Sequence, residues 1–231
     1  MIVLFQLPMT ANYYFDLIVS TLEQQRNPTR AVQQSAYLRN KFTFYGWSKP
    51  DLNAAFKAIN QQHPLRQVKD SSRLIKRLID AEYRELHYGA LFIAEKNLKK
   101  RPPDFISILE QLVTTHSWWD TVDHVAKLVG IHFQRYPKLI IPTTERWMES
   151  ENIWLQRVCI IFQLFYRTQT DWALLQRYIL AVSDSEEFFL QKAAGWALRQ
   201  YSRTAPQRVV AFVQDYELPK LTQREALRLL K

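Results

Sequence analysis

The chain has 231 residues, of which 47% are hydrophobic and 23% are charged, the ordinary balance of a globular protein. Only 4 residues are glycine, which disfavours a hairpin-rich all-β fold because tight hairpin turns need glycine at positive φ. The 31 lysines and arginines exceed the 22 acidic residues, giving a net charge of +9. This excess favours an anionic partner, chiefly nucleic acid.

A single cysteine, Cys159, excludes an internal disulfide and a zinc site built from cysteines. It lies in the apolar run VCIIF at residues 158–162, so we expect it to be a small core residue. The apolar start of the chain lacks the basic segment of a signal peptide, and no stretch approaches the ~20 apolar residues that span a bilayer. We therefore expect a soluble, intracellular protein without a membrane segment.

Helical periodicity dominates the sequence, so the fold class that we predict is all-α. Segments 48–51, 101–104 and 204–206 each offer a cap residue and an early proline, which is typical of a helix start. No run shows the sustained alternation of a strand. In chain order, we expect helices near residues 11–26, 28–40, 50–62, 70–79, 82–98, 103–115, 118–135, 138–148, 151–167, 170–182, 186–202, 205–214 and 221–230.

An internal repeat underlies these helices. The segment WLQR at residues 154–157 recurs as FLQK at residues 189–192, an offset of 35 (189 − 154), and the same spacing counts back to helices near Asp120 and Leu86. Two helices with their turns fill this length, and such hairpins must stack to bury their apolar faces. We therefore predict one domain over residues 1–231, a superhelical solenoid of HEAT-like helical pairs with a basic concave face.

The repeat spacing also predicts a cluster of functional side chains. Trp119 and Asp123 lie one turn apart on one helix face, and Arg157 follows Asp123 by 34 residues (157 − 123). Lys192 follows Arg157 by 35 residues (192 − 157), and Trp196 lies one turn beyond it. Residues one repeat apart become neighbours on adjacent helices, so these five side chains are predicted to meet.

Such a cluster suits the removal of alkylated purines from DNA. N-alkylated purines are cations, which tryptophan faces attract by roughly 0.5–2 kcal/mol. Cleavage of the N-glycosidic bond develops positive charge on the sugar, which a fixed carboxylate at Asp123 would stabilise. Arg157 and Lys192 would hold the flanking phosphates. The charged base is already a good leaving group, so no metal or other cofactor is expected.

Two other interpretations remain open from the residues alone. Tryptophans at helical spacing are usually core residues, although the adjacent Trp118 and Trp119 project about 100° apart on a helix. We expect Trp118 to pack in the core and Trp119 to face the groove. A non-catalytic scaffold that binds DNA or protein would share the fold, and Asp123 discriminates against it because a binder of polyanions has no use for a carboxylate there.

A metalloenzyme is disfavoured by the spacing of the histidines. They form no HExxH pattern and no acidic cluster, although His124 and His132 could share a helix face. We expect ordinary core or surface roles and no metal site for the five histidines: His63, His87, His116, His124 and His132.

Several separated motifs resemble one known family. The segment SWWDTVD at residues 117–123 resembles the central motif of the bacterial DNA alkylation repair enzymes, the AlkD-like glycosylases. The segments ENIWLQR at residues 151–157 and SEEFFLQKAAGWALR at residues 185–199 are similar to further motifs of that family, as is YLRNKFTFYG at residues 37–46. Together they span residues 37–199, most of the chain.

This resemblance implies a HEAT-like monofunctional DNA glycosylase of base excision repair that acts on N3- and N7-alkylpurines in duplex DNA. The substrates would be 3-methyladenine and 7-methylguanine, attacked without flipping the base into a pocket. The protein would be a monomer of the bacterial cytoplasm, associated with the nucleoid when bound to DNA. By resemblance the catalytic group is Asp123, Trp119 and Trp196, and the DNA contacts are Arg157, Arg199, Arg203 and Tyr37.

One segment departs from the family pattern. After Gly46 the family tends to carry a Thr-Pro turn followed by paired arginines, whereas this chain has WSKPDLN at residues 47–53. Lys49 is the cation that this sequence offers for the DNA contact there.

Overall fold

The structure is a computed structural model that describes residues 10–65, 70–96 and 98–230. Its contacts gather into two compact units, Met1–Asn97 and Leu98–Lys231. The prediction of one domain over residues 1–231 stays a prediction.

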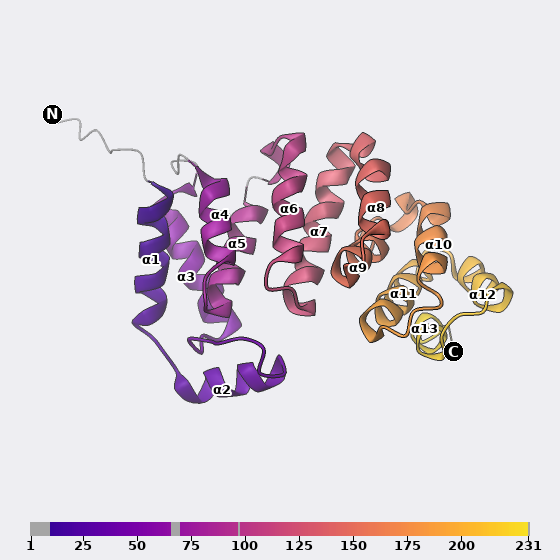
Figure 1. The fold of residues 1–231 in the computed structure, drawn as a ribbon, viewed down its shortest axis with the longest axis horizontal. Helices are drawn as coiled ribbons and strands as arrows, with labels where there is room; N and C mark the ends of the chain where they lie inside the picture. Colours follow the sequence, from indigo (N-terminus) through magenta and orange to yellow (C-terminus); the bar gives the residue numbers. More distant parts are fainter. Residues whose placement is uncertain (1–9, 66–69, 97, 231) are drawn as a thin grey trace. The chain divides into compact units, whose positions relative to one another are not determined.

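Helices account for all of the regular structure in the described ranges. Thirteen α-helices occur there and no strand does, apart from an isolated bridge between Thr43 and Tyr83 (Figure 1). The predicted all-α fold class is therefore confirmed. None of the helices in these ranges is long and apolar enough to cross a membrane.

The first unit holds five α-helices. Helix α1 packs against α3, α4 and α5, and α4 packs along α5. Local signals set where these helices begin, since the side chains of Thr10 and Asn27 cap α1 and α2, and Ser48 caps α3 with Pro50 in its first turn. The helices are α1 (Ala11–Glu23), α2 (Pro28–Tyr37), α3 (Lys49–Gln62), α4 (Ser71–Ile79) and α5 (Arg84–Glu95).

A buried carboxylate fixes the connection between α2 and α3. Glu85 on α5 is 1% exposed and accepts hydrogen bonds from the backbone N–H groups of Tyr45, Gly46 and Trp47. Gly46 has φ of +95°, and a Cβ there would meet the carbonyl oxygen of Asn27 at 2.1 Å, so glycine is required. Backbone donors thus compensate the buried charge and hold the segment that leads to Lys49.

The second unit holds eight α-helices, preceded by two short 3-10 helices (Leu98–Lys100 and Pro103–Phe105). Helix α6 packs on α7, and α8 packs on α9, while α7, α9, α11 and α13 contact one another in that order (Figure 1). We call these four the inner row. The helices are α6 (Ile106–Thr114), α7 (Trp119–Arg135), α8 (Ile140–Glu149), α9 (Ile153–Ile161), α10 (Trp172–Ala181), α11 (Phe188–Tyr201), α12 (Pro206–Asp215) and α13 (Lys220–Ala226).

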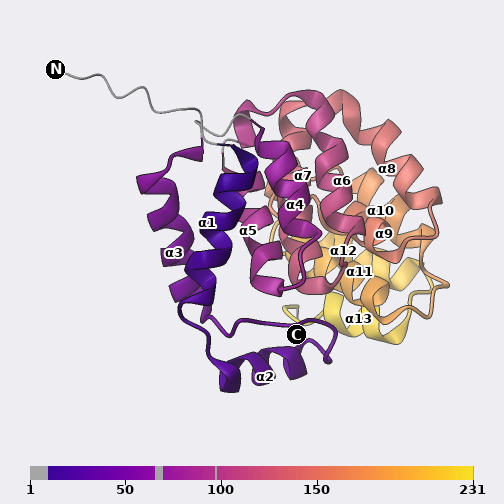
Figure 2. The same cartoon turned by 60° about the vertical axis from the view of Figure 1, so that its left-hand side comes forward.

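Two glycines allow close approach within the inner row. A Cβ on Gly130 of α7 would meet the backbone oxygen of Phe162 at 2.3 Å, and one on Gly195 of α11 would meet the Cβ of Glu225 at 2.5 Å. The backbone of α7 therefore lies directly against the end of α9, and α13 lies directly against α11, as Figure 2 shows for the second pair. The close approach of these helices is accompanied by ion pairs between them, from α7 to α9 and from α11 to α13.

The predicted repeat is visible in matching contacts on α9 and α11. Gln156 donates to the carbonyl of Ser150, and Gln191 donates to the carbonyl of Ser185, both at 3.0 Å. Each pair differs by 35 residues (191 − 156 and 185 − 150), as the sequence spacing requires. The starts of α9 and α11 are therefore built in the same way.

Helix ends differ more from prediction than helix starts. Helix α9 was expected to reach residue 167 but ends at Ile161. The side chain of Gln163 is buried, at 4% exposed, and lies in a turn. Its amide oxygen accepts a hydrogen bond from the N–H of Asp171 at 2.7 Å, and its amide nitrogen donates to the carbonyl of Asp171 at 3.3 Å. The contact between Gln163 and Asp171 therefore accompanies the end of α9, six residues (167 − 161) before the expected end. The buried Cys159, 1% exposed, confirms its predicted place in the core.

Candidate functional site

The centre of the candidate site is an ion pair between α7 and α9. The guanidinium of Arg157 donates from Nε to Oδ1 of Asp123 at 2.7 Å and from Nη2 to Oδ2 at 2.9 Å. The Arg157 side chain is 6% exposed and that of Asp123 is 21% exposed. The sequence prediction that these two side chains meet is confirmed. Two parallel bonds fix both the position and the plane of the carboxylate.

The same guanidinium reaches the third helix of the inner row. Nη1 of Arg157 donates to the carbonyl oxygen of Phe189, in the first turn of α11, at 2.6 Å. Arg157 therefore links α7, α9 and α11 from a buried position. These bonds hold the Asp123 carboxylate in place. The predicted contact of Arg157 with the DNA backbone stays a prediction.

Aromatic side chains close the same end of the helices. Trp118, 8% exposed, lies with its ring centroid 5.7 Å from that of Trp154 and 5.1 Å from that of Phe189. Trp154 and Phe189 are themselves 4.8 Å apart. These three residues follow one another at the repeat spacing and pack the starts of α7, α9 and α11 together. The expectation that Trp118 packs in the core is confirmed.

The two predicted catalytic tryptophans are half-buried on the helices that carry the ion pairs. Trp119 is the first residue of α7, one turn before Asp123. Trp196 lies on α11, one turn after Lys192. Each residue is partly exposed, as a residue that touches a substrate must be. Their direct meeting in one cluster stays a prediction.

The cations beside Trp196 are held by a carboxylate of α13. Nζ of Lys192 donates to Oε1 of Glu225 at 2.9 Å, and Nη1 of Arg199 donates to Oε2 of the same residue. The Glu225 side chain is 10% exposed, and the hydrogen bond from Lys192, followed by that from Arg199, holds its pKa below the ordinary value of 4.5. Lys192 stays 37% exposed, so its predicted DNA contact stays a prediction. Glu225 therefore ties the face that carries Trp196 to α13.

Three further DNA contacts were predicted from the sequence. Arg203 is exposed just beyond the end of α11. Tyr37 and Lys49 belong to the first unit, where Tyr37 ends α2 with 71% of its surface exposed and Lys49 begins α3. Their roles at DNA stay predictions.

Known proteins resemble this chain over most of its length. A family model for the DNA alkylation repair enzyme matches residues 18–230. The chain belongs to the DNA alkylation repair enzyme family. A solved structure of a predicted DNA alkylation repair enzyme from Enterococcus faecalis is similar, with a TM-score of 0.82 and 30% identity over 89% of this chain and 97% of that one. No curated protein matches the sequence.

Two of the five histidines of this family member have structural surroundings. His87 is fully buried between Arg84 and the carbonyl of Ala81, and Nε2 of His132 lies 3.1 Å from the carbonyl of Pro103. Burial lowers the pKa of His132. Within the part of the chain that the structure describes, no group of three His, Cys, Asp or Glu side chains could hold a metal ion.

Two carboxylates of this family member escaped the sequence reasoning. Glu85 binds backbone N–H groups, for which no local sequence signal exists. Glu225 follows Leu190 by 35 residues (225 − 190), so the repeat spacing would have placed it beside the start of α11. The repeat was followed in the sequence only as far as the helix of Trp196, so Glu225 was not predicted.

Proposed function

We propose that this chain is a DNA glycosylase that hydrolyses the N-glycosidic bond of positively charged N3- and N7-alkylpurines in duplex DNA, such as 3-methyladenine and 7-methylguanine. The observation that carries the proposal is the Asp123 carboxylate, which Arg157 fixes with two hydrogen bonds while 21% of the Asp123 side chain stays exposed. Membership in the DNA alkylation repair enzyme family supports alkylated DNA as the substrate.

The bonding of Asp123 leaves it able to act on a sugar and a water molecule. An ionised carboxylate offers about four acceptor positions, and Arg157 takes one on each oxygen. The others face away from the guanidinium. As the bond from C1′ to the base breaks, the sugar gains positive charge, and a fixed negative charge beside it stabilises that state without reorganising.

The proposed reaction is a simple hydrolysis. The cationic base leaves with the electron pair of the C1′–N bond and becomes neutral. Water supplies the oxygen that bonds to C1′, Asp123 orients this water, and the proton that the water loses passes to solvent. The products are the free alkylated base and an abasic site in an otherwise intact strand.

The tryptophans would place the damaged nucleotide against Asp123. Trp119 lies one turn from Asp123 on α7, and the half-buried Trp196 lies on α11, whose first turn bonds Arg157. Aromatic faces attract the charge of the alkylated nucleotide by roughly 0.5–2 kcal/mol. We propose that they contact the nucleotide while its base stays stacked in the duplex, since these side chains lie on helix surfaces.

The test separates excision from binding. Asp123→Asn keeps the shape of the side chain and removes its charge, so we expect release of 7-methylguanine from methylated duplex DNA to fall by at least about 100-fold, the scale of electrostatic stabilisation. Binding of the duplex should stay within about threefold of wild type. Asp215→Asn, the same substitution at an exposed position of α12, is the matched control and should excise normally.

Unchanged excision by the Asp123→Asn variant would refute the proposed role of the carboxylate. Tight binding without excision by the wild-type protein would instead support a scaffold that binds DNA.

A further inference from the structure

Three cations of the inner row, on the helices next to Asp123 and Trp196, are bonded to carboxylates. Arg157 is bonded to Asp123, and Lys192 and Arg199 share Glu225. The first pair cancels in charge, and the second group keeps one net positive charge. Phosphates of a duplex gain most from cations that have no acidic partner, so the DNA backbone should find its contacts elsewhere in this unit.

Arg167 and Arg203 are among the arginines of the second unit whose guanidinium groups are unoccupied. Across residues 10–65, 70–96 and 98–230, no hydrogen bond or ion pair involves the guanidinium of Arg167 or that of Arg203, and both residues are exposed. They are 36 residues apart (203 − 167), close to one repeat, and each follows the end of an inner-row helix, α9 or α11. The repeat therefore presents the same charged group twice.

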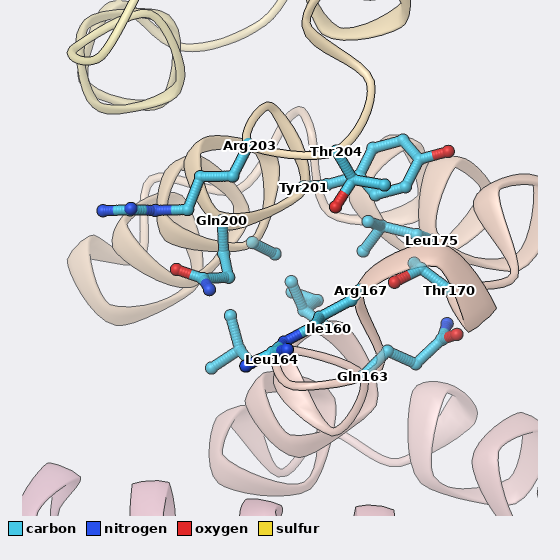
Figure 3. Close-up of a pocket in the computed structure, with 11 residues that line it drawn as sticks. Ile160, Gln163, Leu164, Arg167, Thr170, Leu175, Gln200, Tyr201, Arg203 and Thr204 are labelled. Carbon is cyan, nitrogen blue, oxygen red and sulfur yellow. The ribbon is translucent and has the colours of Figure 1, made fainter.

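A cavity of about 340 Å³ is lined by both of these arginines. Figure 3 shows the guanidinium groups of Arg167 and Arg203 and the amide of Gln200 extending toward one side of this cavity. Tyr201 and Leu175 line the opposite side, toward α10. One end of the cavity is therefore apolar, and the other carries two positive charges and an amide donor.

The charged side of the cavity continues the face of α11 that carries Trp196. Gln200 follows Trp196 by four residues, which places both on one side of α11, and Arg203 follows just beyond the end of this helix. Seven helical residues rise about 10 Å, which equals the rise of about three base pairs of duplex DNA. A nucleotide strand that passes Trp196 can therefore reach the cavity without leaving this face.

We propose that Arg167, Gln200 and Arg203 form a seat for one phosphate of the DNA backbone, about three nucleotides from the base that Asp123 acts on. We call these three residues the phosphate seat. This inference rests on the proposed action on duplex DNA. Planar guanidinium groups bind phosphate oxygens through paired N–H donors, and two of them around one cavity neutralise one phosphate charge. The Gln200 amide adds a further donor.

The backbone conformation of Arg167 supports a defined direction for its side chain. Its φ is +55°, in the left-handed region that costs a residue other than glycine roughly 1–2 kcal/mol. The turn is closed by the N–H of Thr170, which donates to the carbonyl of Arg167 at 3.2 Å. The conformation turns the chain sharply after α9 and directs residue 167 toward the cavity.

The experiment measures duplex binding against salt concentration by fluorescence anisotropy. The variants are Arg167→Gln, Arg203→Gln and the double variant, with Arg177→Gln on α10 as a control that removes the same charge from an exposed arginine paired with Glu145. Because the two seat arginines share one phosphate, either one alone still neutralises it, so each single variant should keep a slope of log K against log salt close to that of wild type, and the double variant should lower this slope by about 0.9. The affinity of the double variant near 0.1 M salt should fall about eightfold, the factor that a slope change of about 0.9 gives between about 0.1 M and 1 M salt. The Arg177→Gln slope should equal that of wild type.

Three outcomes would overturn the proposal. A slope unchanged by the double variant, with only a lower melting temperature, would mean that the arginines merely stabilise the helix ends. A slope of log K against log salt that falls by about 1.8 in the double variant would mean that the two arginines bind two separate phosphates and share no seat. Calorimetric binding of inorganic phosphate that the double variant loses, with an unchanged DNA slope, would assign the cavity to free phosphate.

This experiment distinguishes failure of the seat from failure of the proposed glycosylase activity. Binding and its salt slope need no excision. Excision of 7-methylguanine is therefore measured separately, with the wild-type protein and with Asp123→Asn, and its outcome does not depend on the slopes of the arginine variants. A wild-type protein that binds duplex with the expected slopes but never releases a base would leave the phosphate seat supported and refute the activity.

Discussion

Replacing Arg157 by alanine removes the three hydrogen bonds that join α7, α9 and α11. Asp123 loses both of its bonds to the guanidinium, and the carbonyl of Phe189 loses one. Removing one partner of a buried ion pair costs about 3–5 kcal/mol. Water reaches part of Asp123, which is 21% exposed, so the lower end of that range applies. We expect a loss of about 3 kcal/mol, which lowers the melting temperature of a chain of this size by about 6–12 °C.

The matched control is Arg146→Ala. Arg146 on α8 also binds a carboxylate with two parallel bonds, both 2.6 Å long, to Glu110 on α6. Its side chain is 59% exposed, against 6% for Arg157. Exposed pairs contribute about 0–1 kcal/mol, so the melting temperature should fall by less than about 4 °C. Thermal unfolding followed by circular dichroism measures both variants under one condition.

The comparison also includes Arg157→Lys. Lysine keeps the charge but cannot form the paired bonds, so we expect an intermediate loss of stability and reduced excision. Equal melting temperatures for Arg157→Ala and Arg146→Ala would refute the reasoning, because burial would then not distinguish two ion pairs that each have two hydrogen bonds to a carboxylate.

Three further predictions concern the packing of the second unit. The lowered pKa of Glu225 means that its ion pairs stabilise the protein above pH 4.5, its ordinary pKa, and that this stabilisation disappears as the pH falls through the folded value. The difference in melting temperature between wild type and Glu225→Gln should therefore shrink from about pH 6 to about pH 3, and a constant difference would contradict the assignment. Gly130→Ala should lose about 1–3 kcal/mol in denaturant titrations because its Cβ would meet the Phe162 oxygen at 2.3 Å, whereas a stabilised variant would show that α7 and α9 are further apart. Burial raises the pKa of the Cys159 thiol, so the native protein should not react with Ellman's reagent until denaturant unfolds it, and rapid native reaction would place Cys159 at the surface.

Local signals explain why the fold could be predicted from the sequence. Helix α2 begins at Pro28 behind its Asn27 cap, as expected, because capping and the fixed φ of proline act within one turn. The end of α9 could not be predicted, because it depends on the contact between Gln163 and Asp171. Contacts of this kind form only once the chain has folded.

The candidate site was predictable to the extent that it follows the repeat. The period placed Asp123 beside Arg157, and the structure pairs them. It could not tell that the pairing would bury Arg157 and remove it from the surface, because burial depends on how closely the helices approach. Glu225 and Arg167 follow the same period but lie outside the segments that match the family motifs.

The identity of the reaction product tests the proposed function most directly. Wild-type protein in excess over a duplex that contains one 7-methylguanine should release the free methylated base, identified by mass, and leave an abasic site in an uncleaved strand. The Asp123→Asn variant should leave the duplex unchanged over the same time. Recovery of an intact duplex with an unmethylated guanine, or no change with the wild-type protein, would contradict hydrolysis at the site of Asp123 and Arg157.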